Sequence, residues 1–100
     1  MKSAVDPGII SEIWSVIQER AITPSQESYT SRLLTDIKGI DKVLEKIGEE
    51  SAEFIIAAKN GKPERTVEEA SDLIFHLLVA LRAADIDLSD VMQELKKRRK

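Results

Sequence analysis

The sequence contains no cysteine and only one histidine, so two common kinds of site are excluded at once. Disulfide bonds need cysteine, and the usual zinc sites need several cysteine or histidine ligands. Aromatic residues are also scarce, at 4% of 100 residues. The core must therefore be built from Leu, Ile, Val and Ala, which suits helices packed on helices better than packed sheets.

Long hydrophobic runs are missing as well. The longest nearly apolar stretch covers residues 73–81, is interrupted by His76, and is shorter than the roughly 18–20 residues that a membrane span needs. Residues 1–10 lack the hydrophobic segment of a signal peptide. We therefore expect a cytoplasmic protein with no membrane contact. A glycine-rich phosphate loop and a nucleophile elbow are absent too, so phosphate would be held by a metal ion and by basic side chains, with Lys46, Lys59, Lys62 and Arg65 as the candidates.

The basic residues are unevenly distributed along the chain. Residues 96–100 read KKRRK and hold five of the 15 basic residues, whereas the rest of the chain carries 10 basic and 18 acidic residues. A nucleic-acid-binding domain normally has a basic face, so this acidic body argues against nucleic acid as a partner. We interpret the tail as a solubilising helix end whose cations complement the helix dipole. Contact with an anionic partner is the alternative.

The spacing of hydrophobic residues predicts an all-α fold of four to five short helices in a single domain, residues 1–100. No segment shows sustained alternation of apolar and polar residues, the pattern of a strand. Asp6 and Pro7 are typical of a helix start, and Gly39 and Asn60–Gly61 of helix ends. The predicted helices cover residues 7–20, 28–38, 40–59, 63 or 66 to 84, and a last segment capped by Asp87.

A homodimer is predicted from the helix that ends near residue 84. Its apolar residues surround most of the helix axis, and the other short helices cannot cover it on every side. A second copy of the chain would cover it, so we expect the third and fourth helices of two subunits to form a shared bundle. Gly48 supports this, because a mid-helix glycine costs roughly 1 kcal/mol relative to alanine and suits close approach of another backbone.

Acidic residues separated by two others place two carboxylates on one helix face. The sequence has three such pairs, namely Glu50/Glu53, Glu69/Asp72 and Asp87/Asp90. The third pair lies at a helix start, where acids complement the dipole. The first two lie beside apolar positions, where carboxylates that repel one another are costly. A bound Mg²⁺ would remove this cost, because it prefers oxygen ligands and leaves positions for water or phosphate.

Structural explanations compete with a metal site. Glu69 would be the capping-box partner of Thr66 if the helix began there. Ordinary surface ion pairs at helical spacing would account for Glu49 and Glu53, with Lys46 or Lys59 as partners. His76 follows Asp72 by four residues, and would be either a buried core residue or one that orients Asp72 or touches a ligand.

The acidic residues also match a known pattern. Glu49-Glu50-x-x-Glu53, followed after 15 residues by Glu69-x-x-Asp72, resembles the EExxE…ExxD pattern of the all-α nucleoside triphosphate pyrophosphatase superfamily, which includes MazG-like enzymes and dimeric dUTPases. The surroundings resemble the phosphoribosyl-ATP pyrophosphatase family over nearly the whole chain. The matching residues are Glu19, Arg20, Ser28, Tyr29, Thr30, Leu33, Lys46, Gly48, Glu49, Glu50, Glu53, Glu69, Asp72, Leu73 and His76. Ser71 departs from the alanine that is usual there, without functional consequence.

The resemblance implies hydrolysis of phosphoribosyl-ATP to phosphoribosyl-AMP and pyrophosphate, the second step of histidine biosynthesis. It implies Mg²⁺ as cofactor, replaceable by Mn²⁺, with the ligands Glu50, Glu53, Glu69 and Asp72. Glu49, or a free oxygen of a ligand carboxylate, would be the general base, and Lys46 would bind phosphate during catalysis. The other implied contacts to this nucleotide are Tyr29, Thr30, His76 and Arg20.

Two other functions stay open at this point. A MazG-like housekeeping enzyme would share the carboxylates but not the segment 28–30 or the residues around Lys46. A non-catalytic helical dimerisation module would use the same hydrophobic stripes and ignore the acids. Mg²⁺-dependent release of pyrophosphate separates the module from both enzymes, and a comparison of substrates separates the enzymes.

Overall fold

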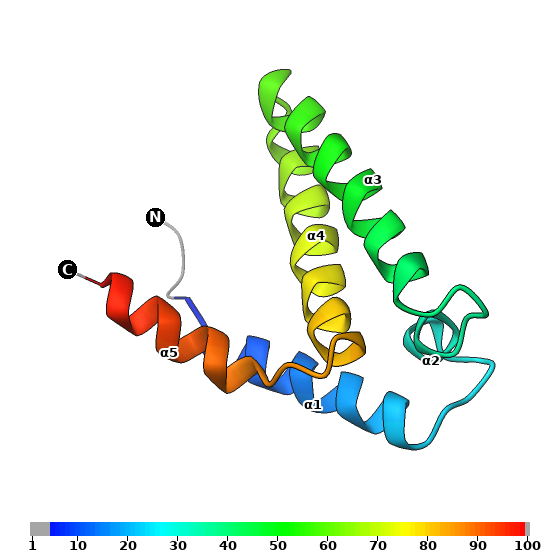
Figure 1. Ribbon diagram of the computed structural model, residues 1–100. Helices are drawn as coiled ribbons and strands as arrows, with labels where there is room; N and C mark the ends of the chain where they lie inside the picture. Colours follow the sequence, from blue (N-terminus) through cyan, green and yellow to red (C-terminus); the bar gives the residue numbers. More distant parts are fainter. Residues whose placement is uncertain (1–4, 100) are drawn as a thin grey trace.

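Five helices and no strand make up residues 5–99, the part of the chain that the computed structural model describes (Figure 1). The helices are α1 (Ile9–Ile22), α2 (Tyr29–Leu34), α3 (Ile40–Lys59), α4 (Pro63–Ala83) and α5 (Leu88–Arg98). The predicted all-α fold is confirmed. Residues 1–4 and Lys100, the last residue of the basic tail, lie outside the described part. Among the described helices, none is both long and apolar enough to cross a membrane.

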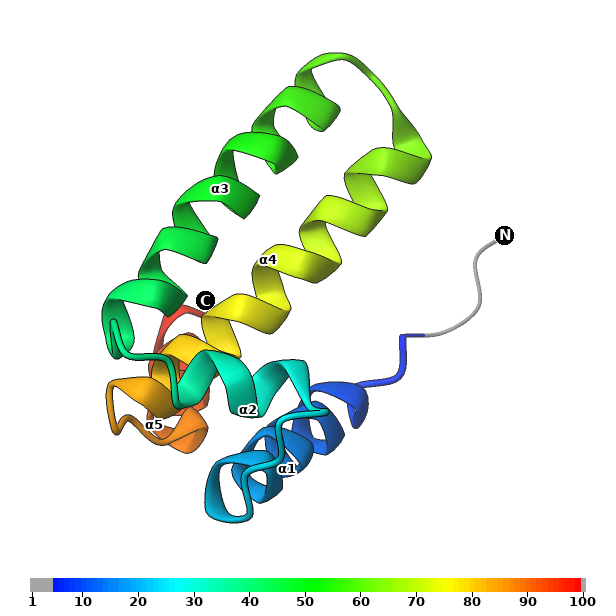
Figure 2. The ribbon, with the colours of Figure 1, turned by 90° about the vertical axis from the view of Figure 1, so that its right-hand side faces the viewer.

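Helices α3 and α4 form a long antiparallel hairpin that projects from the other helices (Figure 1 and Figure 2). Only residues 60–62 separate the two helices. Gly61 in this turn has a φ of 62°, a left-handed conformation that suits glycine. Pro63 then begins α4 at a position where its missing N–H costs nothing. The short turn forces the two helices to lie side by side.

The hydrophobic core lies at the base of the hairpin, where α1 and α2 pack against it. The core cluster contains Ile17, Leu33, Val43, Leu78, Val79 and Leu88. Arg82 of α4 also donates a hydrogen bond to Gln18 of α1. Ser28 caps α2, since its Oγ accepts the backbone N–H of Ser31 (3.1 Å). The base therefore fixes α2 against the lower part of the hairpin.

The predicted bounds of α1 and α2 are wrong by a few residues. Helix α1 begins at Ile9, because Asp6 Oδ1 accepts the N–H of Gly8 (2.9 Å) in a turn that precedes the helix. It also continues two residues beyond the predicted end. Helix α2 ends at Leu34, four residues earlier than predicted. There Asp36 Oδ1 accepts the N–H of the residue two positions later (2.9 Å) and turns the chain.

The other three helices agree with the sequence prediction. Of the two predicted starts of α4, Pro63 is correct. Thr66 therefore lies inside the helix, where its hydroxyl donates to the Lys62 carbonyl oxygen (2.7 Å), so the capping-box explanation of the acid at position 69 is wrong. Asp87 caps α5 as predicted, and accepts the N–H of Ser89 at Oδ1 (2.8 Å).

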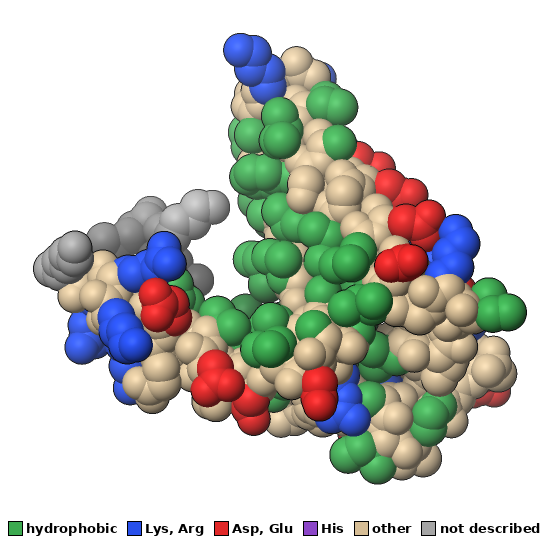
Figure 3. All heavy atoms as spheres, viewed as in Figure 1, with side chains coloured by type: hydrophobic (Ala, Val, Ile, Leu, Met, Phe, Trp, Pro, Cys, Tyr) green, Lys and Arg blue, Asp and Glu red, His purple; other side chains and the backbone are tan. Residues whose placement is uncertain are grey.

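Much hydrophobic surface on the hairpin is left uncovered. The radius of gyration is 14.8 Å, against about 13 Å for a compact domain of this length. Figure 3 shows hydrophobic side chains along the side of the hairpin that faces α5, and acidic side chains along the opposite edge. We use the term uncovered apolar face for Leu44, Ile55, Val67, Ile74 and Leu77, which are between 45% and 66% exposed.

Candidate metal and phosphate site

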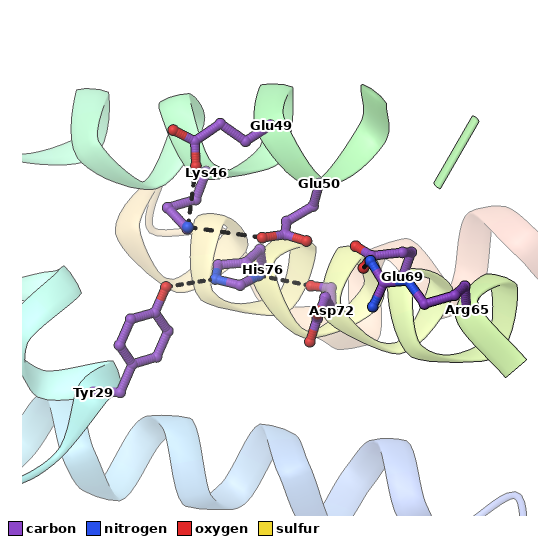
Figure 4. Close-up of polar contacts among 8 residues, drawn as sticks. All are labelled: Tyr29, Lys46, Glu49, Glu50, Arg65, Glu69, Asp72 and His76. Carbon is purple, nitrogen blue, oxygen red and sulfur yellow. Dashed lines mark hydrogen bonds and ion pairs between the residues drawn. The ribbon is translucent and has the colours of Figure 1, made fainter. Parts of the chain in front are cut away.

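Three acidic side chains from the hairpin helices meet between α3 and α4. Glu50 lies in the middle of α3, and Glu69 and Asp72 lie one turn apart on α4. One carboxylate oxygen of each lies within 4.8 Å of those of the other two. Figure 4 shows the three side chains converging from the two helices. The antiparallel hairpin thus brings together acids from two different helices.

Two of these carboxylates are buried, and each leaves one oxygen atom without a partner. Glu50 is 7% exposed and Glu69 is 3% exposed. The Oε1 atom of each faces a basic side chain, whereas the Oε2 atom of each is buried with no hydrogen-bond donor. Buried acceptors are costly unless a donor or a cation satisfies them. Together with Asp72, the two acids fit a hard cation such as Mg²⁺, which takes carboxylate oxygens as ligands.

Glu53, the fourth predicted ligand, lies at the exposed edge of this cluster. Its oxygens fall outside the group whose members lie within 4.8 Å of one another. Glu53 nevertheless affects Glu69. A hydrogen bond to Glu53 that becomes available only when Glu69 is protonated, together with burial and the charge of Glu53, raises the pKa of Glu69 to about 7, although Arg65 lowers it. The pKa of Glu69 therefore lies closer to neutral pH than that of an ordinary carboxyl group.

Basic side chains flank the carboxylate cluster at its two ends (Figure 4). On α3, Lys46 Nζ lies 3.1 Å from Glu49 Oε2 and 3.7 Å from Glu50 Oε1. On α4, Arg65 Nη2 lies 2.6 Å from Glu69 Oε1. The hydrogen bond to Glu49 raises the pKa of Lys46, so the ammonium keeps its charge. The carboxylate of Glu49 points toward Lys46 and not toward the acids of α4.

His76 connects the carboxylate cluster with α2. Its Nδ1 lies 2.7 Å from the carbonyl oxygen of Asp72, and its Nε2 lies 2.8 Å from the Tyr29 hydroxyl. A carbonyl oxygen only accepts, so Nδ1 carries the proton and, in the neutral ring, Nε2 accepts a hydrogen bond from Tyr29. Burial raises the pKa of Tyr29 while Lys46 lowers it, with a net increase that keeps the hydroxyl a donor. His76 is 4% exposed and positions Tyr29.

The remaining predicted substrate contacts lie at different depths. Tyr29 is 41% exposed, whereas its neighbour Thr30 is 6% exposed. Only the first therefore presents a large surface to a ligand in a single chain. Arg20 lies in the last turn of α1, and its guanidinium pairs with the adjacent Glu19 (3.0 Å). The described contacts of the Arg20 side chain do not join it to the carboxylate cluster.

Two interactions at this site were not anticipated from the sequence. The hydrogen bond between Tyr29 and His76 joins residues 47 positions apart, and no spacing rule indicates a contact between separate helices. The pair Arg65–Glu69 is a different case, because four residues is the ordinary spacing of helical ion pairs. A helix that begins at Pro63 includes both residues and places them on one face of α4.

The raised pKa of Glu69 predicts a pH-dependent stability of the metal-free protein. Its ordinary value is 4.5 and its folded value is about 7, so the folded state binds more protons between these two values. The stability that this group contributes is complete below pH 4.5 and is lost as the pH rises through about 7. In EDTA, we expect the melting temperature of the wild type to fall as the pH rises over this range, and the melting temperature of Glu69→Gln to fall less. Parallel curves for the two proteins would contradict the assignment, because other groups titrate equally in both.

Comparison with known proteins shows the family to which the chain belongs. The family model for phosphoribosyl-ATP pyrophosphohydrolase matches residues 10–99. A phosphoribosyl-ATP pyrophosphatase from Methanoregula boonei is 69% identical over 99% of this chain and 95% of the relative, and one from Methanoculleus marisnigri is 63% identical over 95% of this chain and 98% of the relative. The histidine biosynthesis bifunctional protein HisIE from Gloeobacter violaceus is 47% identical over 91% of this chain and 40% of its own length. As the sequence resemblance predicted, the chain belongs to the phosphoribosyl-ATP pyrophosphohydrolase family of enzymes.

Proposed function

We propose that this chain hydrolyses phosphoribosyl-ATP to phosphoribosyl-AMP and pyrophosphate, the second step of histidine biosynthesis, and that the reaction requires Mg²⁺. Family membership and relatives whose names carry this activity support the reaction. The observation that carries the metal requirement is the pair of buried, unpartnered oxygens on Glu50 and Glu69. A cation that binds carboxylate oxygens satisfies both atoms at once.

The acids are proposed as the metal ligands. Glu50, Glu69 and Asp72 would hold the ion between the two helices, and Glu53 would complete the set from the exposed edge. Mg²⁺, or Mn²⁺ in its place, would polarise the phosphoanhydride and neutralise charge on the pyrophosphate leaving group. The hairpin supplies these four carboxylates from two rigid helices, which fixes where the phosphates must lie.

The groups around the acids are proposed to bind substrate and to activate water. Lys46 would bind phosphate oxygens, since its ammonium lies at one end of the carboxylate cluster. Glu49, held by Lys46 at 3.1 Å, would be the general base for the attacking water, and a free oxygen of a ligand carboxylate is the alternative. Tyr29, fixed by His76, would form a wall of the substrate site. The other proposed substrate contacts are Thr30 and Arg20.

The first experiment on this proposal compares substrates. With Mg²⁺, the purified protein should release pyrophosphate, and not single phosphate, from phosphoribosyl-ATP. Turnover of ATP or dUTP should be far slower, because the segment containing Tyr29 borders the carboxylate cluster and metal–triphosphate chemistry alone does not require it. EDTA should stop the reaction, and Mg²⁺ or Mn²⁺ should restore it. Similar kcat/KM values for ATP and phosphoribosyl-ATP would favour a MazG-like enzyme, and pyrophosphate from neither would favour the helical module.

Amide substitutions test the ligand set, because they keep shape and remove charge. Glu50→Gln and Asp72→Asn should each lower kcat/KM by at least roughly a hundredfold, since even partners outside the ligand shell typically cost ten- to a hundredfold. Calorimetry should show weaker Mg²⁺ binding, while the melting temperature stays the same or rises as carboxylate repulsion falls. Asp87→Asn is the matched control, and should change only the stability of α5. Full turnover by the site variants at saturating Mg²⁺ would rule out this ligand set.

We further propose that the protein is a homodimer that pairs through the uncovered apolar face, and that it is cytoplasmic. Gly48 lies between Leu44 and Ile55 at helical spacing, on the same side of α3. Apart from its chain neighbours and the nearby backbone of α3 itself, no described atom lies within 4 Å of the position that a Cβ at Gly48 would take. A second chain can therefore approach α3 closely there. Large contiguous apolar surfaces usually mark such contacts.

Light scattering at low micromolar concentration tests the dimer, with twice the 11.2 kDa chain mass as the expected result. Leu77→Asp should dissociate or unfold it, because an unpaired charge would enter the interface. Gly48→Leu distinguishes a dimer that packs at this position from a monomer. In a monomer the site is open, so the variant should be more stable, because leucine favours a helix over glycine by roughly 0.8 kcal/mol. In a dimer packed at Gly48, the added side chain should disrupt the interface. Ile37→Asp, fully exposed outside the hairpin, is the control. A folded wild-type monomer would refute the proposal.

A further inference from the structure

Arg65 makes the shortest ion pair among the described residues, and its partner is a buried acid. Its Nη2 lies 2.6 Å from Glu69 Oε1, and its Nη1 lies 3.2 Å from Glu68 Oε1. The Arg65 side chain is 58% exposed, whereas that of Glu69 is 4% exposed. An exposed cation therefore neutralises a buried carboxylate, and Figure 4 shows the two side chains at the right-hand end of the carboxylate cluster.

A metal ion at the carboxylate cluster would weaken this ion pair. The free oxygen of Glu69 is Oε2, which is buried and has no donor. A cation bound there shares one carboxylate with the guanidinium, and the two positive charges repel at short range. Arg65 lies in the first turn of α4 and is exposed. Its side chain can turn away without opening a cavity in the core.

A groove of about 320 Å³ lies beside Arg65, at the turn between α3 and α4. Its lining residues are Glu53, Ile56, Ala57, Asn60, Lys62 and Arg65. Glu53 also influences the pKa of Glu69, and Arg65 pairs with Glu69, so the groove adjoins the proposed metal site. Lys62 and Arg65 give the groove two cations against the single carboxylate of Glu53, and Asn60 adds an amide. Such a lining suits phosphate oxygens, which guanidinium groups bind through two parallel hydrogen bonds.

We propose that Arg65 exchanges one anion for another during binding. It pairs with Glu69 in the metal-free protein and is displaced from Glu69 when the metal binds. It then binds, together with Lys62, a phosphate of the metal-bound nucleotide in this groove. The inference rests on the proposed function, because a phosphate must be present to receive the guanidinium. It follows that Arg65 weakens binding of the metal alone and strengthens binding of the metal together with phosphate.

The experiment compares full-length wild type with Arg65→Met and with a matched control, Arg98→Met. Arg98 also pairs with an acid four residues away, Glu94 at 3.4 Å, but on α5. Calorimetry with Mn²⁺ alone should show about two- to fivefold tighter binding to Arg65→Met, the upper part of the range for ion pairs whose cation is exposed. Inorganic pyrophosphate in saturating Mg²⁺ should bind at least about tenfold more weakly. KM for phosphoribosyl-ATP should rise by a similar factor with a smaller change in kcat, and Arg98→Met should match wild type in every measurement.

Arg65→Lys keeps the charge and serves as the second variant, with partial recovery of pyrophosphate binding as the expected result. Unchanged or weaker Mn²⁺ binding by Arg65→Met would overturn the displacement. Tighter Mn²⁺ binding with unchanged pyrophosphate binding would make Arg65 a static counter-ion and would equally overturn the proposal. Failure of the proposed function has a different signature: the wild type would bind Mn²⁺ and pyrophosphate with this dependence on Arg65, yet hydrolyse no phosphoribosyl-ATP.

Discussion

The burial of two carboxylates between α3 and α4 is the constraint on which the rest of the structure depends. Glu50 and Glu69 are held almost entirely away from solvent, and each has one oxygen paired with a cation and one without a partner. Such an arrangement is unfavourable by itself. It persists because the core at the base of the hairpin, around Val43 and Val79, holds the two helices in register. The base supplies the stability that the acidic part of the hairpin lacks.

The helices and the group of acids could be predicted from the sequence, because both depend on local spacing. Helical periodicity placed α3, α4 and α5 correctly, whereas Asp6 and Asp36 shifted two helix ends through hydrogen bonds to nearby backbone. The depth of each acid could not be predicted. Glu50 and Glu53 lie one turn apart on the same helix, yet the first is buried and the second is exposed. That difference depends on how far α3 is rotated about its own axis relative to α4. The spacing of hydrophobic residues in the sequence does not determine this rotation.

The position of α2 shows the same limit. With six residues, this helix is too short to be stable alone, so contacts made at a distance in the sequence hold it in place. Leu33 enters the core, and the Tyr29 hydroxyl donates to His76. The acids, by contrast, follow from the local spacing of residues within α3 and α4. The type of chemistry at the candidate site can therefore be predicted from the sequence, whereas the position of Tyr29 beside it is known only from the tertiary structure.

The turn at residues 60–62 has a consequence for how the molecule folds. All four acids lie within residues 50–72, and closing so short a loop costs little chain entropy. Contacts between residues close in sequence tend to form early. We therefore expect the carboxylates of α3 and α4 to approach one another early in folding, before the helices at the base have all packed. A cation that relieves their repulsion at that stage would speed folding, with less effect on how long the native state lasts.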